Sequence, residues 1–129
     1  MIRIEDIDKT KSVYQNVMDV LIAKGFECYP PATKKGECQR PYIVIKSNGS
    51  SQINNYSSRV VYIRLLLYVP QNEFSKLDEF EKAVKDTIDE YLYPLIKYTG
   101  QNEVDFFDDN INGHLRTILY RYNERDRHL

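Results

Sequence analysis

RVVYIRLLLYV, the segment Arg59–Val69, has the alternation of a β-strand that is buried on one face. Every second residue from Val61 to Val69 is aliphatic, whereas the intervening residues are aromatic, apolar or basic. A period of two puts the aliphatic set on one side of a strand, and a helix would spread it around its axis. The β-branched and aromatic content and the closing Pro70 also favour a strand. We therefore expect a core strand here.

The segment that follows has the pattern of an amphipathic helix. Its apolar residues recur at steps of three and four, which places them on one stripe: Leu77, Phe80, Val84, Ile88, Tyr91, Leu92 and Leu95. Ser75 is a candidate N-cap, with Asp78 as the acidic partner of a capping box. Pro94 disfavours helical geometry at Tyr93, so the helix should stop or kink there. We expect this helix to pack on the sheet.

A first helix and a short strand are expected near the N-terminus. The segment Asp6–Lys24 carries apolar residues at helical spacing, and Gly25 directly after it is a typical C-terminal cap. A short strand is then expected at Phe26–Tyr29.

A second strand and two connections are expected before the central strand. Pro41 opens the strand Tyr42–Lys46, where proline costs no interior hydrogen bond. The polar stretch Ala32–Arg40 is predicted to be a loop, and Ser47–Ser58 a long hairpin connection. A connection of that length is either a surface excursion or a functional contact.

The last regular element is expected at His114–Tyr122, beside the central strand and antiparallel to it. Its two faces alternate: Leu115, Thr117 and Leu119 on one, and Arg116, Ile118, Tyr120 and Tyr122 on the other. Before it, the chain should turn at Thr99-Gly100, and Gln101–Gly113 is predicted to be an acidic loop. The charged tail Asn123–Leu129 is expected to fray.

These segments predict a single α+β domain over residues 1–129. The expected order is α-β-β-β-α-β, with a mainly antiparallel sheet of about four strands and two helices packed on one of its faces.

The charge balance does not indicate a nucleic-acid-binding protein. The chain has 18 Lys and Arg against 19 Asp and Glu, so it lacks the basic surplus that displaces counterions from a duplex. No apolar stretch is long enough to cross a bilayer, and the N-terminus lacks the apolar region of a signal peptide. We therefore expect synthesis in the cytosol, no membrane partner and no specific nucleic acid.

Cys28 and Cys38 are the only thiols. Their spacing matches no zinc knuckle, and we expect them to be unpaired in a reducing compartment. A disulfide, or a ligand set shared with a histidine, is the alternative.

One acidic group could hold a divalent cation: Asp105, Asp108, Asp109 and His114. Its oxygen donors suit a hard cation, but the spacing fits no calcium loop, and turn-forming aspartates explain it equally well. No serine or cysteine lies in a nucleophile signature, and the five glycines form no phosphate-binding pattern. The sequence therefore predicts no catalytic residue and no cofactor.

The chain has 11 tyrosines, and the outer faces of the two long strands are predicted to carry tyrosine together with arginine. These residues are enriched in interfaces because they combine a large contact area with a polar tip. The predicted interface residues are Arg59, Tyr62, Arg64, Tyr68, Arg116, Tyr120, Arg121 and Tyr122. The alternative is that Tyr62 and Tyr68 lie under a helix. Helices on one face leave the other uncovered, so we expect a partner surface.

Three stretches carry a resemblance to a known family: PYIVIKSNG at Pro41–Gly49, RVVYIRLLLYVPQ with LDEFEKAVKDTIDEYL after it, and TGQNEVDFFDDNINGHLRTILYRY near the C-terminus. With the order of elements, they resemble the tail terminator or tail-completion proteins of bacteriophages and prophages. The resemblance implies a non-enzymatic structural protein that assembles with itself into a ring, often a hexamer. Such a ring caps the tail tube and joins it to the head connector.

The resemblance also implies partners and a location. The partners would be further copies of the chain, the tail-tube protein and head-tail connector proteins, in the host cytoplasm during assembly and then in the virion tail. Two other functional classes remain as alternatives. A metal-dependent enzyme would need the acidic group above to converge, and a regulatory or nucleic-acid-binding module would need Arg59, Arg64, Arg116 and Arg121 to form one patch.

Overall fold

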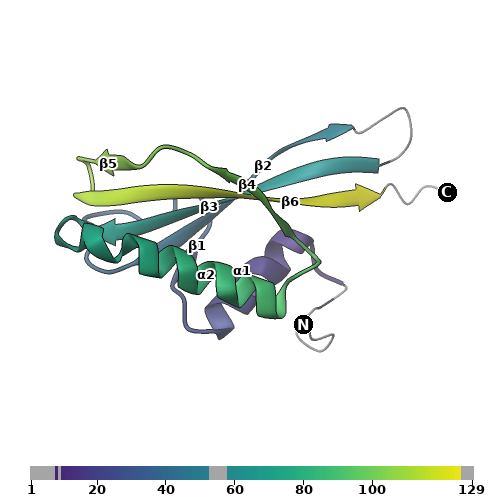
Figure 1. The fold of residues 1–129 in the computed structure, drawn as a ribbon, viewed down its shortest axis with the longest axis horizontal. Coiled ribbons are helices and arrows are strands. Elements are labelled where there is room, and N and C mark those ends of the chain that lie inside the picture. The colour runs from purple at the N-terminus through teal and green to yellow at the C-terminus, as the bar shows by residue number, and fades with distance from the viewer. Residues whose placement is uncertain (1–7, 9, 53–57, 126–129) are drawn as a thin grey trace.

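A computed structural model of the chain describes residues 8, 10–52 and 58–125. It has the expected α+β architecture, with both α-helices on one side of a β-sheet (Figure 1). The elements in chain order are α1 (Val13–Ala23), β1 (Cys28–Tyr29), β2 (Tyr42–Gln52), β3 (Ser58–Pro70), the 3-10 helix η2 (Gln71–Lys76), α2 (Leu77–Tyr91), β4 (Lys97–Asn102), β5 (Phe106–Asp108) and β6 (Gly113–Arg125).

The sheet is mixed and has six strands, in the order β1-β2-β3-β6-β4, with β5 also paired to β6. β1 runs parallel to β2, and the other pairs are antiparallel. The expectation of about four strands is therefore too low. The two additional strands, β4 and β5, form within segments that were expected to be a turn and a loop. Their side chains are mostly exposed and show no apolar alternation, so pairing with the edge of β6 determines their conformation.

The expected core strand is confirmed as β3. Its alternate residues Ile63, Leu65, Leu67 and Val69 are fully buried at 0% exposure. The covered face of the sheet, which the helices pack against, also includes Ile118 of β6, opposite Leu65. Burial of these aliphatic side chains is the main source of stability of the two-layer fold.

Helix α1 is shorter than expected at its N-terminus. Ser12 is the N-cap, and its side chain accepts a hydrogen bond from the Gln15 amide at 3.1 Å. The helix therefore begins at Val13, after the cap, and not at Asp6. At its other end Gly25 has a φ of +99°, the left-handed conformation expected of a glycine cap.

Helix α2 begins differently from the prediction and ends as predicted. The capping box is wrong, because Ser75 lies inside η2 and the residue before α2, Lys76, makes no side-chain cap bond. The 3-10 turns lead directly into the α-helix instead. The helix ends at Tyr91, before Pro94, and its buried stripe includes Leu77, Val84 and Ile88.

The predicted hairpin connection Ser47–Ser58 is wrong over most of its length, because β2 continues to Gln52 and β3 already begins at Ser58. A register shift between Ser47 and Ser50 interrupts the pairing. Backbone pairing with β3 sustains the extension of β2 from Ser47 to Gln52, although this part of its sequence has no apolar residues. Residues 53–57 lie outside the described part of the chain.

The predicted fraying of Asn123–Leu129 is wrong for its first residues, because β6 continues to Arg125 in register with Ser58. Residues 126–129 lie outside the described part of the chain. Figure 1 shows that the ends of β2, β3 and β6 extend past the helix layer as a three-stranded arm. In the described segments, no helix is long and apolar enough to cross a membrane.

Candidate interaction surface on the open face of the sheet

The face of the sheet opposite α1 and α2 is here called the open face. By register, its residues include Tyr29, Tyr42, Val44, Lys46, Val60, Tyr62, Arg64, Leu66, Tyr68, Lys97, Phe106, Leu115, Thr117, Leu119, Arg121 and Asn123. At the centre of the open face Leu66 is half-buried, whereas its chain neighbours Leu65 and Leu67, on the covered face, are fully buried. At the β5 margin, Phe106 is 58% exposed. An accessible apolar sheet surface of this kind is typical of a protein-protein contact.

Aromatic rings cluster at one end of the open face. The rings of Tyr42 and Tyr68 stack with their centroids 4.8 Å apart and an interplanar angle of 14°. Tyr29 meets Tyr42 edge-on at 5.7 Å, and Lys34 Nζ lies 5.6 Å from the centre of the Tyr42 ring. Burial is the main reason why the pKa of Tyr42 is raised. This end of the face is therefore closed by the chain itself.

The loop before β2 provides this closure. The Cys38 amide donates to the Ile111 carbonyl at 2.7 Å, which holds the loop against the start of β6. Gly113 permits the approach, because a Cβ atom at that position would lie 2.9 Å from Cys38 Cβ and 3.2 Å from the Val69 carbonyl oxygen. Residues Ala32–Arg40 have no helix or strand, as predicted, and part of this loop packs against the sheet.

Basic side chains form a row across the middle of the open face. Lys46 of β2 is directly opposite Arg64 of β3, and Arg121 of β6 is directly opposite Lys97 of β4. Arg64 and Arg121 are diagonal neighbours, because Arg64 is opposite Leu119, two residues earlier on β6. We call these four residues the basic row. It crosses four adjacent strands.

One carboxylate already reaches the basic row. Glu103 lies 2.7 Å from the Arg64 guanidinium, and its backbone amide donates to the Thr117 carbonyl at 3.0 Å. Within the described residues, Lys46, Lys97 and Arg121 have no carboxylate at ion-pair distance. Among the described residues, the row therefore binds a carboxylate at Arg64 and has no such partner at its other three cations.

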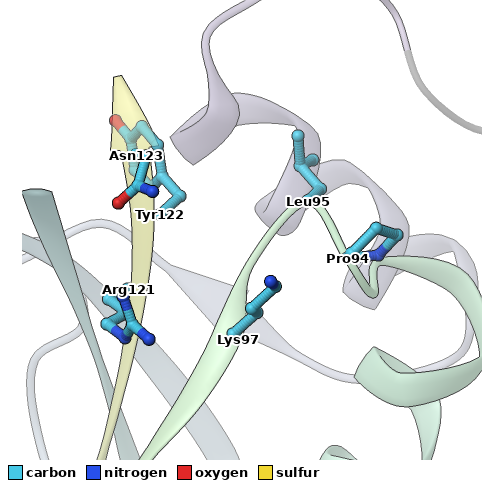
Figure 2. Close-up of a pocket in the computed structure, with 6 residues that line it drawn as sticks. All are labelled: Pro94, Leu95, Lys97, Arg121, Tyr122 and Asn123. Atoms are coloured by element: carbon cyan, nitrogen blue, oxygen red, sulfur yellow. The ribbon is translucent and has the colours of Figure 1, made fainter. Parts of the chain in front are cut away.

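A pocket of about 270 Å³ lies at the Lys97 end of the basic row. Figure 2 shows the side chains of Lys97 and Arg121 on adjacent strands, below the bend at Pro94 and Leu95 that leads into β4. Tyr122 completes the wall together with Asn123. The pocket is open to solvent and has two cations beside it, so an acidic side chain of a partner would fit its chemistry.

The structure divides the predicted interface residues between the two faces. Tyr62, Arg64, Tyr68 and Arg121 lie on the open face, as expected. The placement of Arg59 on this face is wrong, because Arg59 is exposed but lies on the same side of β3 as Val61, opposite Glu124.

The placement of Arg116, Tyr120 and Tyr122 on the outer face is wrong. Tyr120 is opposite Ile63, only 1% exposed, and therefore inside the core. Tyr122 and Arg116 share its side of β6. The predicted alternation is correct, but the opposite set, Leu115, Thr117 and Leu119, faces outward. Tyrosine can be buried in full when its ring packs between a helix and a sheet, so residue type misidentified the face.

Arg116 lies on the covered face, inside a cluster of carboxylates. Its guanidinium makes a bidentate pair with Asp105 at 2.9 and 2.7 Å, and it also contacts Asp78 at 2.5 Å and Glu81 at 2.9 Å. Its side chain is 15% exposed. Because Asp78 and Glu81 belong to α2, the cluster connects that helix to β6. Bidentate, charge-assisted pairs of this kind are the strong ones.

The ionisation of the cluster follows from these contacts. The hydrogen bonds to Arg116 lower the pKa of Asp105. Burial opposes the ionisation of Glu81, but hydrogen bonds from Lys85, Asn102 and Arg116 outweigh it, so the pKa of Glu81 is lowered as well. Asp105 and Glu81 are therefore charged near neutral pH, and their pairs with Arg116 stabilise the fold.

The proposed metal-binding group does not converge. Asp105 pairs with Arg116, and Asp108 accepts a hydrogen bond from the Asn110 amide at 2.9 Å, as a turn-forming aspartate does. His114 lies between the rings of Phe74 and Phe107. In the described residues, which include Asp109, no three His, Cys, Asp or Glu side chains are placed to hold an ion.

Cys28 and Cys38 are both buried and are not bonded to each other. Burial raises the pKa of the Cys28 thiol to about 12, and burial also raises that of Cys38. Both thiols are therefore protonated near neutral pH and are poor nucleophiles. They serve as small packing residues.

Sequence reasoning missed two members of the basic row, Lys46 and Lys97. The alternation of the predicted strand Tyr42–Lys46 already places Lys46 on the side opposite Ile45, but residue type gave no reason to include it in an interface. Lys97 could not, because β4 was not predicted. No protein-family model matches the chain, and no curated protein matches it.

Proposed function

We propose that this chain is a structural protein of a bacteriophage or prophage particle, which assembles with copies of itself into a ring that caps the tail tube. The ring would join the tube to the head connector. The chain would act by binding and would not be an enzyme.

The open face is the observation that carries this proposal. It combines an accessible apolar centre at Leu66 with tyrosine and arginine, the residue types that interfaces favour. Its aromatic end is already closed by the loop that carries Cys38. Among the other residues of this face, Lys46, Lys97, Phe106 and Arg121 are exposed, Leu66 and Leu119 are half-buried, and Thr117 is buried. A second protein surface is the natural cover for a sheet face of this composition.

The shape of the domain also supports an assembled state. The three-stranded arm of β2, β3 and β6 extends past the helices (Figure 1), so it can reach a neighbouring subunit or the tube. The resemblance to tail terminator proteins supplies the identity of the particle. The sheet and its arm supply surfaces that such a ring would use.

Light scattering and electron microscopy test the proposal directly. We expect oligomers whose population rises with protein concentration, and closed rings when the tail-tube protein of the same particle is added. A chain that stays monomeric over the whole soluble range, with and without the tube protein, would contradict the proposal.

The same protein sample tests the two alternatives, a metal-dependent enzyme and a nucleic-acid-binding module. A metal-dependent enzyme would be stabilised against heat by its divalent cation, because a bound ligand favours the folded state. A nucleic-acid-binding module would bind DNA with an affinity that falls steeply as salt increases. We expect neither effect.

A further inference from the structure

The two outer surfaces of the domain carry opposite charge. The open face bears the basic row, in which only Arg64 has a carboxylate at ion-pair distance among the described residues. On the opposite side of the molecule, α2 exposes mainly acidic side chains: Asp78, Glu79, Asp86, Asp89 and Glu90, against the exposed Lys82. One chain thus carries two surfaces of complementary charge, the basic open face and the acidic outer side of α2.

The acidic residues of α2 include a straight line. Glu79, Asp86 and Glu90 are separated by seven and four residues, and at 100° per residue they fall within about 20° of one line along the helix. The buried residues Val84 and Ile88 lie on the opposite side of α2. We call Glu79, Asp86 and Glu90 the acidic ridge. It is the most outward part of the helix layer on α2. Asp86 also pairs with Lys82 of the same helix at 2.7 Å, and both side chains of that pair are largely exposed.

The acidic ridge and the basic row match in length. Eleven residues of helix at 1.5 Å each give the ridge a length of about 16 Å. Three strand spacings of about 4.8 Å and an offset of two residues along the strands separate Lys46 from Lys97, which gives the row a length of about 16 Å. A helix that crosses the strands of the sheet would therefore bring a carboxylate near each end of the row.

We propose that α2 of one copy docks across the basic row on the open face of the next copy, with the acidic ridge against Lys46, Arg121 and Lys97. This inference rests on the proposed function and specifies the contact through which the ring forms. Leu66 and Leu119 would pack beneath the docked helix, and the pocket beside Lys97 would receive an acidic side chain of the ridge.

Such a contact is head-to-tail, because two different surfaces meet. A head-to-tail contact leaves a pair of subunits with one free surface of each kind, so it generates a closed ring or a filament and not only a dimer. A sheet-to-sheet contact between two open faces would instead close a dimer and bring two basic rows together, which like charges oppose.

Charge reversal tests the contact through two matched variants. The sheet variant is Lys97→Glu/Arg121→Glu, and the helix variant is Asp86→Lys/Glu90→Lys; all four residues are exposed. We expect each variant to fold with the circular dichroism spectrum of the wild type. Each should lose at least about tenfold in self-association constant, measured by sedimentation, since like charges then meet at the contact.

Mixing the two variants gives the decisive result. The reversed sheet of one variant complements the reversed helix of the other, and the unchanged surfaces also complement each other, so we expect an equimolar mixture to regain assembly with alternating subunits. The regained assembly should weaken as salt increases.

The possible failures are distinguishable. If the helix variant assembles like the wild type, or the mixture does not recover, the proposed contact is wrong while self-assembly of the wild type still supports the proposed function. If the wild type does not assemble even with the tube protein, the proposed function fails and the contact fails with it.

Discussion

The two faces of the central sheet differ in how they use similar side chains. On the covered face, Arg116 is enclosed by Asp78, Glu81 and Asp105 of its own chain. On the open face, the basic row has one carboxylate from the described part of the chain, Glu103 on Arg64. The charged side chains of the covered face therefore hold the domain together. Those of the basic row, apart from Arg64, are available to a partner.

Adjacent leucines of β3 give the largest expected difference between the faces. Leu65 is fully buried against the helices, so Leu65→Ala should lower the free energy of unfolding by about 2–5 kcal/mol. Leu66→Ala should cost about 1 kcal/mol or less, because Leu66 is half-buried on the open face. Urea denaturation of the two variants measures both values. Equal losses would contradict the assignment of the faces.

Two arginines of β6 give the next difference. Arg116→Met should lower the free energy of unfolding by about 2–3 kcal/mol, because it leaves Glu81 and Asp105 beside each other without their common cation. Arg121→Met, on the exposed side of the same strand, should stay within about 0.5 kcal/mol of the wild type. Thermal denaturation of the two variants measures both changes in stability. A neutral Arg116→Met would show that the cluster does not stabilise the fold.

Gly113 tests the one end of the open face that the chain closes itself. Gly113→Ala should cost about 1–2 kcal/mol, because the new Cβ would press on Cys38 Cβ and the Val69 carbonyl. A double-mutant cycle with Cys38→Gly, measured by chemical denaturation, should recover part of that loss. If the two substitutions were simply additive, the close approach of the loop would not be the cause.

A smaller effect is expected with pH. The folded-state pKa values of Glu81 and Asp105 are lowered from 4.5 and 3.8, so their contribution to stability is complete above those values and is lost as pH falls through the lowered ones. The stability difference between the wild type and Arg116→Met should therefore shrink below about pH 4. Urea denaturation over a pH series measures it. A difference that stays constant with pH would contradict the charged cluster.

The fold could be predicted from the sequence where burial imposes a period. The segment Arg59–Val69 and the stripe of α2 each pack against the core, and their alternation identified them. The arm and the edge strands could not be found in this way. Ser47–Gln52, β4 and β5 are held mainly by backbone pairing, which leaves no mark in the side chains.

The candidate surface could be predicted only in part. The alternation of β3 placed Tyr62, Arg64 and Tyr68 correctly. For β6 the period was correct but the face was wrong, because residue type suggested that leucine points inward and tyrosine outward. Only tertiary packing decides which face of β6 is buried: Tyr120 fills space under α2, and Leu115 and Leu119 lie on the open face.

If another copy of the chain covers the open face, a charge at the centre of that face should block assembly, and sedimentation velocity of two matched variants measures this. Leu66→Glu puts a charge at the centre of the open face, and Ile22→Glu puts the same charge on α1 in the helix layer, where Ile22 is 49% exposed. With folding verified by circular dichroism, we predict that Leu66→Glu stays monomeric at concentrations where the wild type and Ile22→Glu assemble. Assembly of folded Leu66→Glu at the wild-type level would contradict the claim.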